Sequence, residues 1–420
     1  MKFNSPVNYG AVFYLITPDR LAVNEQQSRI IHAMLDLKQH FLLDPAVTFL
    51  NHGSFGATPK PVFEVYQEWQ LRLERQPVLF LGRDYDQLLH ESRMELGKYL
   101  NADPQDLVYI PNATHGVNIV ARSLNLVSGD QVLTSDHEYG ACDYTWDFIC
   151  GKSGANYIHQ QIPLPVHSDE EIIKQFWQGV TPQTKVIYLS HITSPTALKI
   201  PVEQICQRAK RAGILTVIDA AHSPGQIPFD LQALGADIVT GNCHKWMLGA
   251  KGAAFLYVRR ELQDLIEPLV VSWGYKPTAE TSTGFRFIDK LQWTGTKDPA
   301  AALTIPAAIQ FMRENNWADV QIKCHALLRD ALERICDLTG LSPLYPFDSN
   351  YYAQMGIAPL PPSNIAILKS RLYDEYKIEV PLIQWQGRQF ARISVQGYNS
   401  QEDIDKLVNA LKTLLPETAA

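Results

Sequence analysis

The 420-residue chain has few charged residues and no excess of positive charge. Charged residues make up 19% of it and hydrophobic residues 46%, a balance that excludes disorder for most of the chain. The 37 Lys and Arg residues are outnumbered by 44 Asp and Glu residues, so little basic surface is available to neutralise a nucleic-acid backbone. We therefore expect a folded protein with room for an enclosed site and without nucleic acid as a partner.

Cysteine is scarce, and its spacing is irregular. The six cysteines form neither a disulfide framework nor a C-x-x-C metal site, and they are typical of reduced thiols in a cytoplasmic protein. His90 and Glu91 begin like a zinc-binding helix, but Met94 stands where the second His is needed, so no metal site is predicted. The cysteines are Cys142, Cys150, Cys206, Cys243, Cys324 and Cys336.

Long hydrophobic runs are also missing. No stretch approaches the roughly 18 consecutive apolar residues that a membrane-spanning helix needs. The apolar run at residues 9–16 is short, is preceded by Lys2 alone, and is not followed by a small-residue cleavage site. We expect no signal peptide and no association with a membrane.

Short apolar runs alternate with helical patterns between about residues 100 and 260. Apolar strands that lack polar alternation and are joined by helices are typical of a mostly parallel sheet covered on both faces. Ligands of such sheets bind at the carboxyl ends of the strands. The predicted strands are 131–134, 185–190, 214–219, 237–241 and 253–258, and the predicted helices between them are 117–124, 169–177 and 202–212.

The pattern changes after Pro299. A long helix is predicted at 300–315, another continues to residue 336, and 363–376 reads as a helix before an antiparallel pair of strands around Gly387. Ser400 and Asp403 mark the start of a closing helix at 401–415. The predicted organisation is a segment 1–45 that packs on the small domain, a large domain 46–298 and a small α+β domain 299–420.

Three features of the large domain point to chemistry. Asp219 ends an apolar strand, where an ionised carboxylate is costly unless a cation meets it, although a helix cap or a loop ion pair is an alternative. Lys245 follows another strand beside His244, as a Schiff-base lysine with a lowered pKa would, although most lysines are simply solvated. The loop 112–114 opens a helix whose free amides suit a phosphate, with a plain helix cap as the alternative. Together these parts match what pyridoxal phosphate requires.

The chain resembles the class V aminotransferases, which are fold-type I pyridoxal phosphate enzymes, and within them the isopenicillin N epimerase-like branch. The resemblance implies an α/β fold of the aspartate aminotransferase type, with a large domain built on a mostly parallel sheet and a small α+β C-terminal domain. It extends from about residue 40 to the end. The blocks that carry it are FLNHGSFGATP at 49–59, PNATHGVNIV at 111–120, DHEYGA at 136–141, SHITSPTA at 190–197, DAAHSPG at 219–225, GNCHKW at 241–246 and ARISVQGYNSQEDID at 391–405.

The resemblance also implies roles for individual residues. Lys245 would carry the cofactor, and Asp219 would bond its pyridine nitrogen. Thr296 matches a residue that reaches the phosphate from the neighbouring subunit, which implies a homodimer with a shared site. The residues expected to bind the phosphate within one chain are Ala113, Thr114, Asn242 and His244.

Three further positions depart from the family or leave alternatives open. Tyr139 stands where relatives place a ring-stacking His, and a Tyr face can pack in the same way, although an ordinary aromatic at the sheet edge is an alternative. His222 replaces the Gln of many relatives and Ser194 replaces their Asn, both near the phenolic oxygen of the cofactor. These departures affect the tuning of the ring more than its binding.

Two arginines are candidates for binding the substrate. Arg392 matches the Arg that grips the α-carboxylate, and its planar guanidinium suits that bidentate task, although a strand-surface Arg without a role is the alternative. Arg83 could line the substrate pocket or lie on the solvated surface. The expected substrate is a small molecule of the amino-acid type.

The reaction follows from what the protein does at Cα. We expect Lys245 to act as the general base, and Tyr139 is a candidate for the proton donor on the opposite face. The leading hypothesis is an epimerase-like enzyme that acts on an amino acid or a peptide-like derivative. A C-S lyase acting on a cysteine derivative or cystine, an aminotransferase, and a pyridoxal phosphate-binding protein without turnover are the alternatives. Residues 337–392 contain no cysteine, so the thiol mechanism of cysteine desulfurases is not expected.

Overall fold

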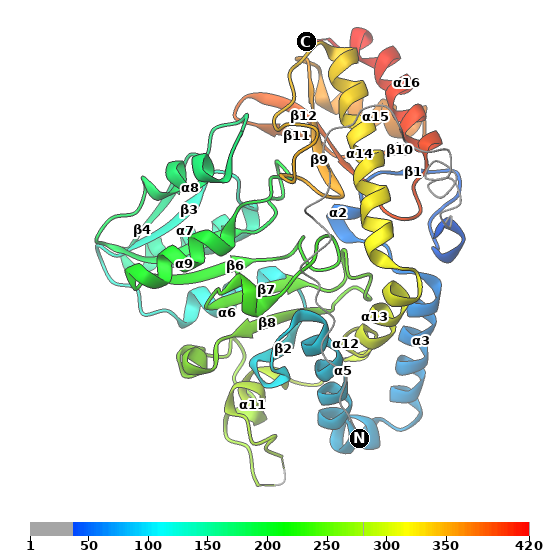
Figure 1. The fold of residues 1–420 in the computed structure, drawn as a ribbon. Coiled ribbons are helices and arrows are strands. Elements are labelled where there is room, and N and C mark those ends of the chain that lie inside the picture. The colour runs from blue at the N-terminus through cyan, green and yellow to red at the C-terminus, as the bar shows by residue number, and fades with distance from the viewer. Residues whose placement is uncertain (1–36, 280, 420) are drawn as a thin grey trace, which may run out of the picture. The chain divides into compact units, whose positions relative to one another are not determined.

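A seven-stranded sheet with the order β2-β8-β7-β6-β5-β3-β4 forms the centre of the larger part of the chain (Figure 1). The computed structural model describes residues 37–279 and 281–419. Neighbouring strands are parallel except at β8, which runs antiparallel to β2 and β7, so the predicted mostly parallel sheet is confirmed. Its strands are β2 (Leu107–Ile110), β3 (Gln131–Ser135), β4 (Asn156–Gln160), β5 (Thr184–Ser190), β6 (Leu215–Asp219), β7 (Ile238–Asn242) and β8 (Ala254–Val258).

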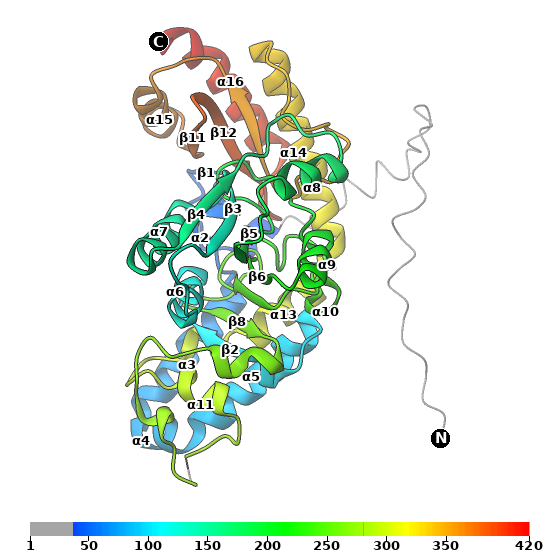
Figure 2. The same ribbon diagram turned by 90° about the vertical axis from the view of Figure 1, so that its left-hand side faces the viewer.

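Helices cover both faces of this sheet, with α6 and α7 on one side and α8 and α9 on the other (Figure 2). Successive residues of a strand point to opposite faces, so Val186 and Tyr188 pack in one apolar cluster and Ile187 and Leu189 in the other. Both faces of the sheet are therefore covered by apolar side chains, which explains the continuous apolar runs in the sequence of its strands. The helices of this region are α6 (Ala113–Ser123), α7 (Gly140–Ser153), α8 (Asp169–Trp177), α9 (Val202–Ala212), α10 (Leu231–Leu234) and α11 (Arg286–Gln292).

The C-terminal part has its own three-stranded antiparallel sheet, in the order β11-β12-β9. Gly387 has φ 72°, which suits the tight turn between β11 and β12, so the predicted hairpin is confirmed. The capping box of Ser400 and Asp403 is also present. The elements are β9 (Met355–Leu360), β11 (Leu382–Trp385), β12 (Arg388–Ser394), α14 (Trp317–Thr339), α15 (Ile365–Asp374) and α16 (Gln401–Glu417).

The region 300–315, predicted as one long helix, consists of two helices, so the prediction of a continuous helix was wrong. The chain breaks at Thr304 between α12 (Ala300–Leu303) and α13 (Ile305–Glu314). Pro306 lies in the first turn of α13 and has no N–H to donate to the preceding turn, so a continuous helix would lose a hydrogen bond there. Both helices pack against helices from near the start of the described chain, α3 (Lys60–Arg75) and α5 (Tyr85–Leu100).

The start of the described chain lies against the C-terminal part. Strand β1 (Thr48–Phe49) pairs in parallel with β10 (Ile378–Glu379), and the ring of Phe41 meets that of Tyr398 at 4.8 Å. The expected packing of segment 1–45 on the small domain falls, for residues 1–36, outside the described residues. The remaining elements are short: η2 (Leu37–His40), α2 (His52–Phe55), α4 (Pro77–Leu79), η3 (Phe80–Asp84), η4 (Pro104–Asp106), η5 (Arg260–Leu265) and η6 (Trp273–Tyr275).

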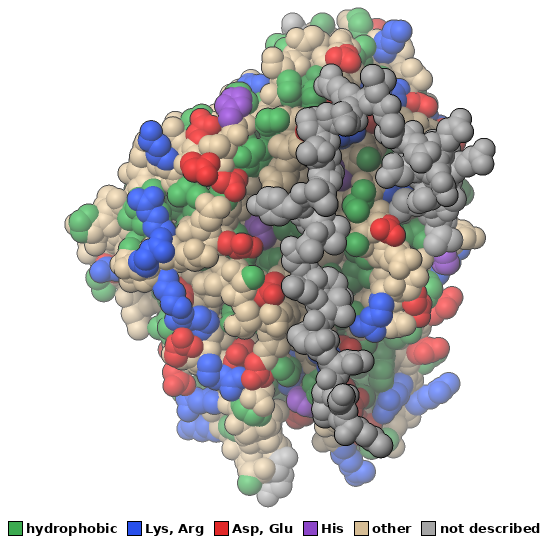
Figure 3. Space-filling model, viewed as in Figure 1, with side chains coloured by type: hydrophobic (Ala, Val, Ile, Leu, Met, Phe, Trp, Pro, Cys, Tyr) green, Lys and Arg blue, Asp and Glu red, His purple; other side chains and the backbone are tan. Residues whose placement is uncertain are grey.

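One face of the molecule can be described for its charge. On the face seen in Figure 3, acidic and basic side chains of the described residues are interspersed. Within residues 37–279 and 281–419, no helix is both long enough and apolar enough to cross a membrane.

Candidate active site

A cavity of about 580 Å³ lies at the carboxyl ends of the central strands. Strands β5, β6 and β7 end there at Ser190, Asp219 and Asn242, because parallel neighbours end at the same edge of a sheet. The structure brings together in its walls most of the residues named from the sequence: Ala113, Thr114, Tyr139, Ser194, Asp219, His222, Asn242, His244 and Lys245.

The turn that carries Lys245 is held by two closely approaching glycines. Gly56 and Gly225 have φ of 70° and 86°, a region that favours glycine. A Cβ at Gly56 would lie 2.1 Å from the carbonyl oxygen of His244, and one at Gly225 would lie 2.2 Å from that of Trp246. Backbone from two other loops thus presses on both sides of Lys245 and fixes the position of its main chain.

Asp219 is a buried carboxylate at the base of the cavity, 4% exposed. It accepts hydrogen bonds from the Ala221 amide at 2.8 Å and the Tyr188 hydroxyl at 3.3 Å, and the Cys142 thiol lies 3.8 Å away. Burial raises the pKa of Asp219, while the charge of Lys245 pulls it down. Among the described residues no cation lies within ion-pair distance of Asp219, so a cationic ring nitrogen would complete its environment.

Lys245 is partly buried and lines the same cavity. Burial lowers the pKa of its amine to about 8, with the positive charge of Arg392 acting in the same direction and Asp219 opposing. Its Nζ lies 3.3 Å from Nε2 of His222. A substantial fraction of the amine is therefore neutral near pH 8, as a nucleophile toward an aldehyde must be.

This lowered pKa is measurable in the cofactor-free protein. Because burial depresses it, we expect trace labelling with acetic anhydride to modify Lys245 with an apparent pKa near 8, whereas an ordinary lysine titrates at about 10.4. Peptide mapping across pH 6–11 reads each lysine separately, and the exposed lysines serve as internal references. A labelling curve for Lys245 that coincides with theirs would contradict the lowered pKa.

The start of α6 offers a donor for an anion. Asn112 caps the helix by accepting from the His115 amide, and the Ala113 amide donates to Oδ1 of Asn242 at 2.8 Å. Among the described residues no acceptor is assigned to the amide of Thr114, which lines the cavity. The plain cap and the phosphate-binding alternative therefore coexist, because the cap uses one amide and leaves another for a phosphate oxygen.

Asn242 and His244 adjoin this helix end. Oδ1 of Asn242 is used by Ala113, so its amide nitrogen is the group left to donate to an anion. His244 donates from Nδ1 to the carbonyl of Ala253 at 3.1 Å, and burial lowers its pKa to about 4. A bound dianion would favour the protonated ring and make Nε2 a donor as well.

Arg392 reaches the cavity wall from β12 of the C-terminal part. Its guanidinium donates to the carbonyl and hydroxyl oxygens of Ser194, at 2.7 and 3.1 Å, and to the hydroxyl of Ser54 at 2.9 Å. It is 6% exposed, and its buried Nε has no hydrogen-bond partner among the described residues. Burial lowers its pKa to about 10, so the group remains cationic at neutral pH, and none of the described carboxylates pairs with it.

The other predicted residues lie elsewhere or at the rim. Tyr139 lines the cavity at the start of α7 and is about half exposed. Arg83, in η3, and Thr296 are both exposed, and neither is among the residues that line the cavity of this single chain. Cys243, two residues before Lys245, is fully buried.

Several residues around the site were not identified from the sequence. His52 bonds the hydroxyl of Tyr398 at 3.0 Å and the carbonyl of Lys245 at 3.1 Å, and Ser54 bonds Arg392. Tyr188 contacts Asp219 from an apolar strand. For His52 and Ser54, the only signal in the sequence was the block FLNHGSFGATP that contains them. Nothing in the sequence distinguished Tyr188 from an aromatic residue of the core.

Comparisons with known proteins agree with this geometry. The sequence model of the family described as "Aminotransferase class-V" matches residues 56–407. Isopenicillin N epimerase of Amycolatopsis lactamdurans is 33% identical over 393 residues, covering 91% of this chain and 98% of that protein. A probable chloroplastic L-cysteine desulfhydrase of Arabidopsis thaliana is 27% identical, covering 89% and 84%. The apo structure of a cysteine desulfurase from Thermococcus onnurineus NA1 superposes with a TM-score of 0.75 at 21% identity, covering 91% and 98%.

A mostly parallel sheet with a lysine and a carboxylate at its carboxyl edge defines the class of fold-type I pyridoxal phosphate enzymes. The chain belongs to the aminotransferase class-V family. The fold class, the family and the cofactor that we expected from the sequence are thereby confirmed. The cavity fits the group, because it offers a buried carboxylate without a cation, an available helix amide and a lysine of lowered pKa.

Proposed function

We propose that this enzyme acts at the Cα of an amino acid or a peptide-like derivative, with epimerisation as its reaction. The observation that carries the proposal is Arg392, a buried cation in contact with a cavity-lining serine and without a carboxylate partner. A substrate α-carboxylate would supply the missing charge in a bidentate geometry. The relatedness to an isopenicillin N epimerase supports epimerisation.

The chain's own groups provide binding and proton transfer. Pyridoxal phosphate, when bound, supplies an electron sink for charge that develops at Cα. Thr114, Asn242 and His244 would hold its phosphate, while Asp219 would keep a positive charge at its ring nitrogen. Lys245 would carry its aldehyde carbon, with His222 and Ser194 near its phenolic oxygen and Tyr139 stacked on its ring.

Lys245 and Arg392 act on the substrate in this proposal. Arg392 orients the carboxylate so that the Cα–H bond faces the amine of Lys245, which takes the proton as a general base. With a pKa near 8, this amine can both accept and return a proton near neutral pH. Epimerisation then requires a donor on the opposite face, and Tyr139 is our candidate.

A second candidate function is C-S lysis of a cysteine derivative or cystine. The relatedness to a probable L-cysteine desulfhydrase favours it, and all the residues named so far would serve it equally. Transamination uses the same first proton transfer. A pyridoxal phosphate-binding protein without turnover is the remaining alternative. The lowered pKa of Lys245 and the unpaired Nε of Arg392 support catalysis instead.

Incubation in deuterated water separates these reactions. Amino acids, small peptides and cysteine conjugates are incubated with the holoenzyme, and the products are analysed by chiral chromatography and mass spectrometry. Inversion at Cα with one deuterium incorporated is the expected result. Pyruvate with released thiol would establish lysis, and a keto acid with aminated cofactor would establish transamination.

Tyr139 can be tested with the same assay. We expect Tyr139→Ala to weaken cofactor binding about tenfold, because a stacked aromatic contributes about 0.5–1.5 kcal/mol beyond its buried area. Tyr139→Phe keeps the ring, so it should bind cofactor as the wild type does. If the hydroxyl is the second-face donor, Tyr139→Phe will exchange the α-proton but lose inversion. Full inversion by Tyr139→Phe would remove Tyr139 from that role.

We also propose a cytoplasmic homodimer with a site shared between subunits. The six cysteines are buried and unpaired, which supports a reducing compartment. Phe55, which lines the cavity and is 73% exposed, supports a partner surface there. Within each chain the proposed domains are 46–298 for the cofactor and 299–420 for the small domain that carries Arg392.

The dimer predicts a contribution of Thr296 in trans. Thr296→Ala should weaken cofactor affinity by about tenfold to a hundredfold, because one hydrogen bond to a charged group is lost. Sedimentation should give a mass of two chains. A dimer mixed from Thr296→Ala and Lys245→Ala chains should contain one site altered at both residues and one with neither change. A monomer that binds cofactor with full affinity would contradict the proposal.

A further inference from the structure

His222 is buried, and both of its ring nitrogens have partners. Nδ1 accepts a hydrogen bond from the indole Nε1 of Trp246 at 3.2 Å, and Nε2 lies 3.3 Å from Nζ of Lys245. The side-chain amide of Gln226 donates to the His222 carbonyl at 2.7 Å, which fixes the backbone from which the ring projects. His222 therefore links the Trp246 indole directly to the amine that would carry the cofactor.

The indole determines which nitrogen of His222 carries the proton. An indole N–H can only donate, so Nδ1 must present its lone pair. In the neutral ring the hydrogen is then on Nε2. Burial and the charges of Lys245 and Arg392, with His52 and His244 nearby, lower the pKa of His222 and favour the neutral ring. His222 thus presents Nε2–H to the cavity that it lines, and the Lys245 amine can accept this hydrogen when it is neutral, above its pKa of about 8.

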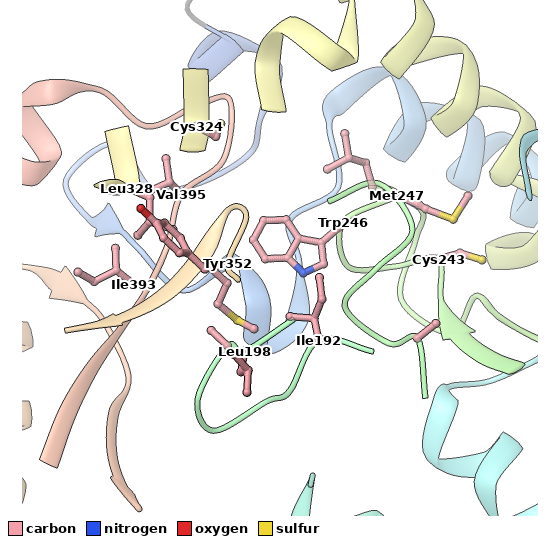
Figure 4. Close-up of a cluster of buried hydrophobic side chains, with 14 of the residues drawn as sticks. Ile192, Leu198, Cys243, Trp246, Met247, Cys324, Leu328, Tyr352, Ile393 and Val395 are labelled. Carbon is pink, nitrogen blue, oxygen red and sulfur yellow. The ribbon is translucent and has the colours of Figure 1, made fainter. Parts of the chain in front are cut away.

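Trp246 is itself held firmly. Its side chain is 0% exposed and lies in a cluster with Ile192, Met247 and Tyr352, with the indole nitrogen on the side of Ile192 (Figure 4). Its ring meets that of His52 at 4.9 Å. A donor in such a packed position has little freedom to rotate away from its acceptor.

We propose that Trp246 is a positioning residue, which fixes His222 in the tautomer protonated at Nε2 so that His222 donates to the phenolic oxygen of the cofactor. That oxygen is on the ring carbon next to the one bearing the aldehyde, and the aldehyde is the group that Lys245 binds. His222 would thus donate to the phenolic oxygen in place of the side-chain amide of the Gln that many relatives have at this position. Only the identity of the acceptor rests on the proposed function; the tautomer does not.

The tautomer can be read in the cofactor-free wild-type protein, and a variant is needed only to assign the signals. Nitrogen-15 spectra of histidine-labelled protein distinguish a ring nitrogen that carries hydrogen from one that does not, and His222→Gln identifies the His222 signals among the 12 histidines. At pH 9, where the Lys245 amine is mostly neutral and can accept, we expect a bare Nδ1 and a protonated Nε2. The opposite tautomer, or a charged ring, at this pH would overturn the proposal.

The consequence for the cofactor is read from the pH titration of the visible chromophore of the holoenzyme. Trp246→Phe removes the indole donor and lets His222 adopt the other tautomer. An oxygen without a donor keeps more negative charge and holds the neighbouring proton more tightly, so the pKa of the chromophore should rise by about one unit. His222→Gln supplies an amide donor, and adding Trp246→Phe to it should cause no further rise.

Trp317→Phe is the matched control. Its buried indole also bonds the same loop, at the Gly225 carbonyl, but does not touch His222. We expect this variant to leave the chromophore pKa unchanged. An equal rise in Trp317→Phe, or a rise from Trp246→Phe that persists in the His222→Gln background, would overturn the positioning role. Failure of all variants and the wild type to form a chromophore would instead contradict the proposed function.

Discussion

Replacing Lys245 by alanine is expected to lower kcat/KM by at least about 10⁴-fold, because one side chain supplies both the attachment of the cofactor and the general base. The pocket, the Asp219 carboxylate and the α6 amides remain. The variant should therefore still bind pyridoxal phosphate, but as the free aldehyde, with the absorbance that the aldehyde has in solution. Kinetics and visible spectra of the purified variant test both parts.

Two controls make this result specific to Lys245. Lys251→Arg changes a lysine six residues away that lines a different hollow, and it should leave spectrum and turnover intact. Added methylamine should restore part of the activity of Lys245→Ala, since a small amine can occupy the space of the deleted side chain. Activity within tenfold of the wild type in Lys245→Ala would show that another group removes the proton.

The second large effect is expected at Arg392. Arg392→Gln should lower kcat/KM by about 10²- to 10³-fold, since breaking a buried charge pair costs about 3–5 kcal/mol. The cofactor should remain bound, because the guanidinium contacts Ser194 and Ser54 and not Lys245, but the pKa of the chromophore should rise, since the positive charge of Arg392 is lost. Steady-state kinetics on the best substrate of the deuterium panel measure the loss.

A matched control lies on the same strand. Arg388 of β12 is exposed and stacks on Phe390 at 5.3 Å, so Arg388→Gln should leave kcat/KM within a factor of two to three, as surface substitutions do. A substrate analogue with its carboxylate replaced by an amide gives a double-mutant cycle. The analogue should be poor with wild type and nearly insensitive to Arg392→Gln. Equal sensitivity of acid and amide would show that Arg392 does not bind the carboxylate.

The sheet and the cofactor residues on it could be predicted from the sequence because local patterns encode them. Buried parallel strands are written as apolar runs, and a polar residue at the end of a run is placed at the carboxyl edge by the topology alone. Asp219 ends β6 and Lys245 follows the neighbouring strand β7, so we could expect them in one cavity from the topology alone. The hairpin at Gly387 and the cap at Ser400 are likewise local signals.

The contacts that hold the site could not be predicted in this way. His52 and Tyr398 are separated by 346 residues, and Ser54 and Arg392 by 338, so no local period links them. The bond from Trp246 to His222 depends on the rotamers of two buried rings. Strand β4 was not predicted, because its residues are largely exposed and do not form an apolar run. Thr296 and Arg83 are not among the residues that line the cavity of one chain, and their roles are proposals.

The most direct test of the central claim is reduction of the wild-type holoenzyme with borohydride, followed by peptide mapping. Lys245 lines the same cavity as Asp219, so the reduced cofactor should be found on the peptide that contains GNCHKW, in a yield close to one per chain. The visible absorbance should disappear at the same time. Cofactor fixed on another lysine, or protein that remains colourless and unmodified after incubation with pyridoxal phosphate, would contradict the account.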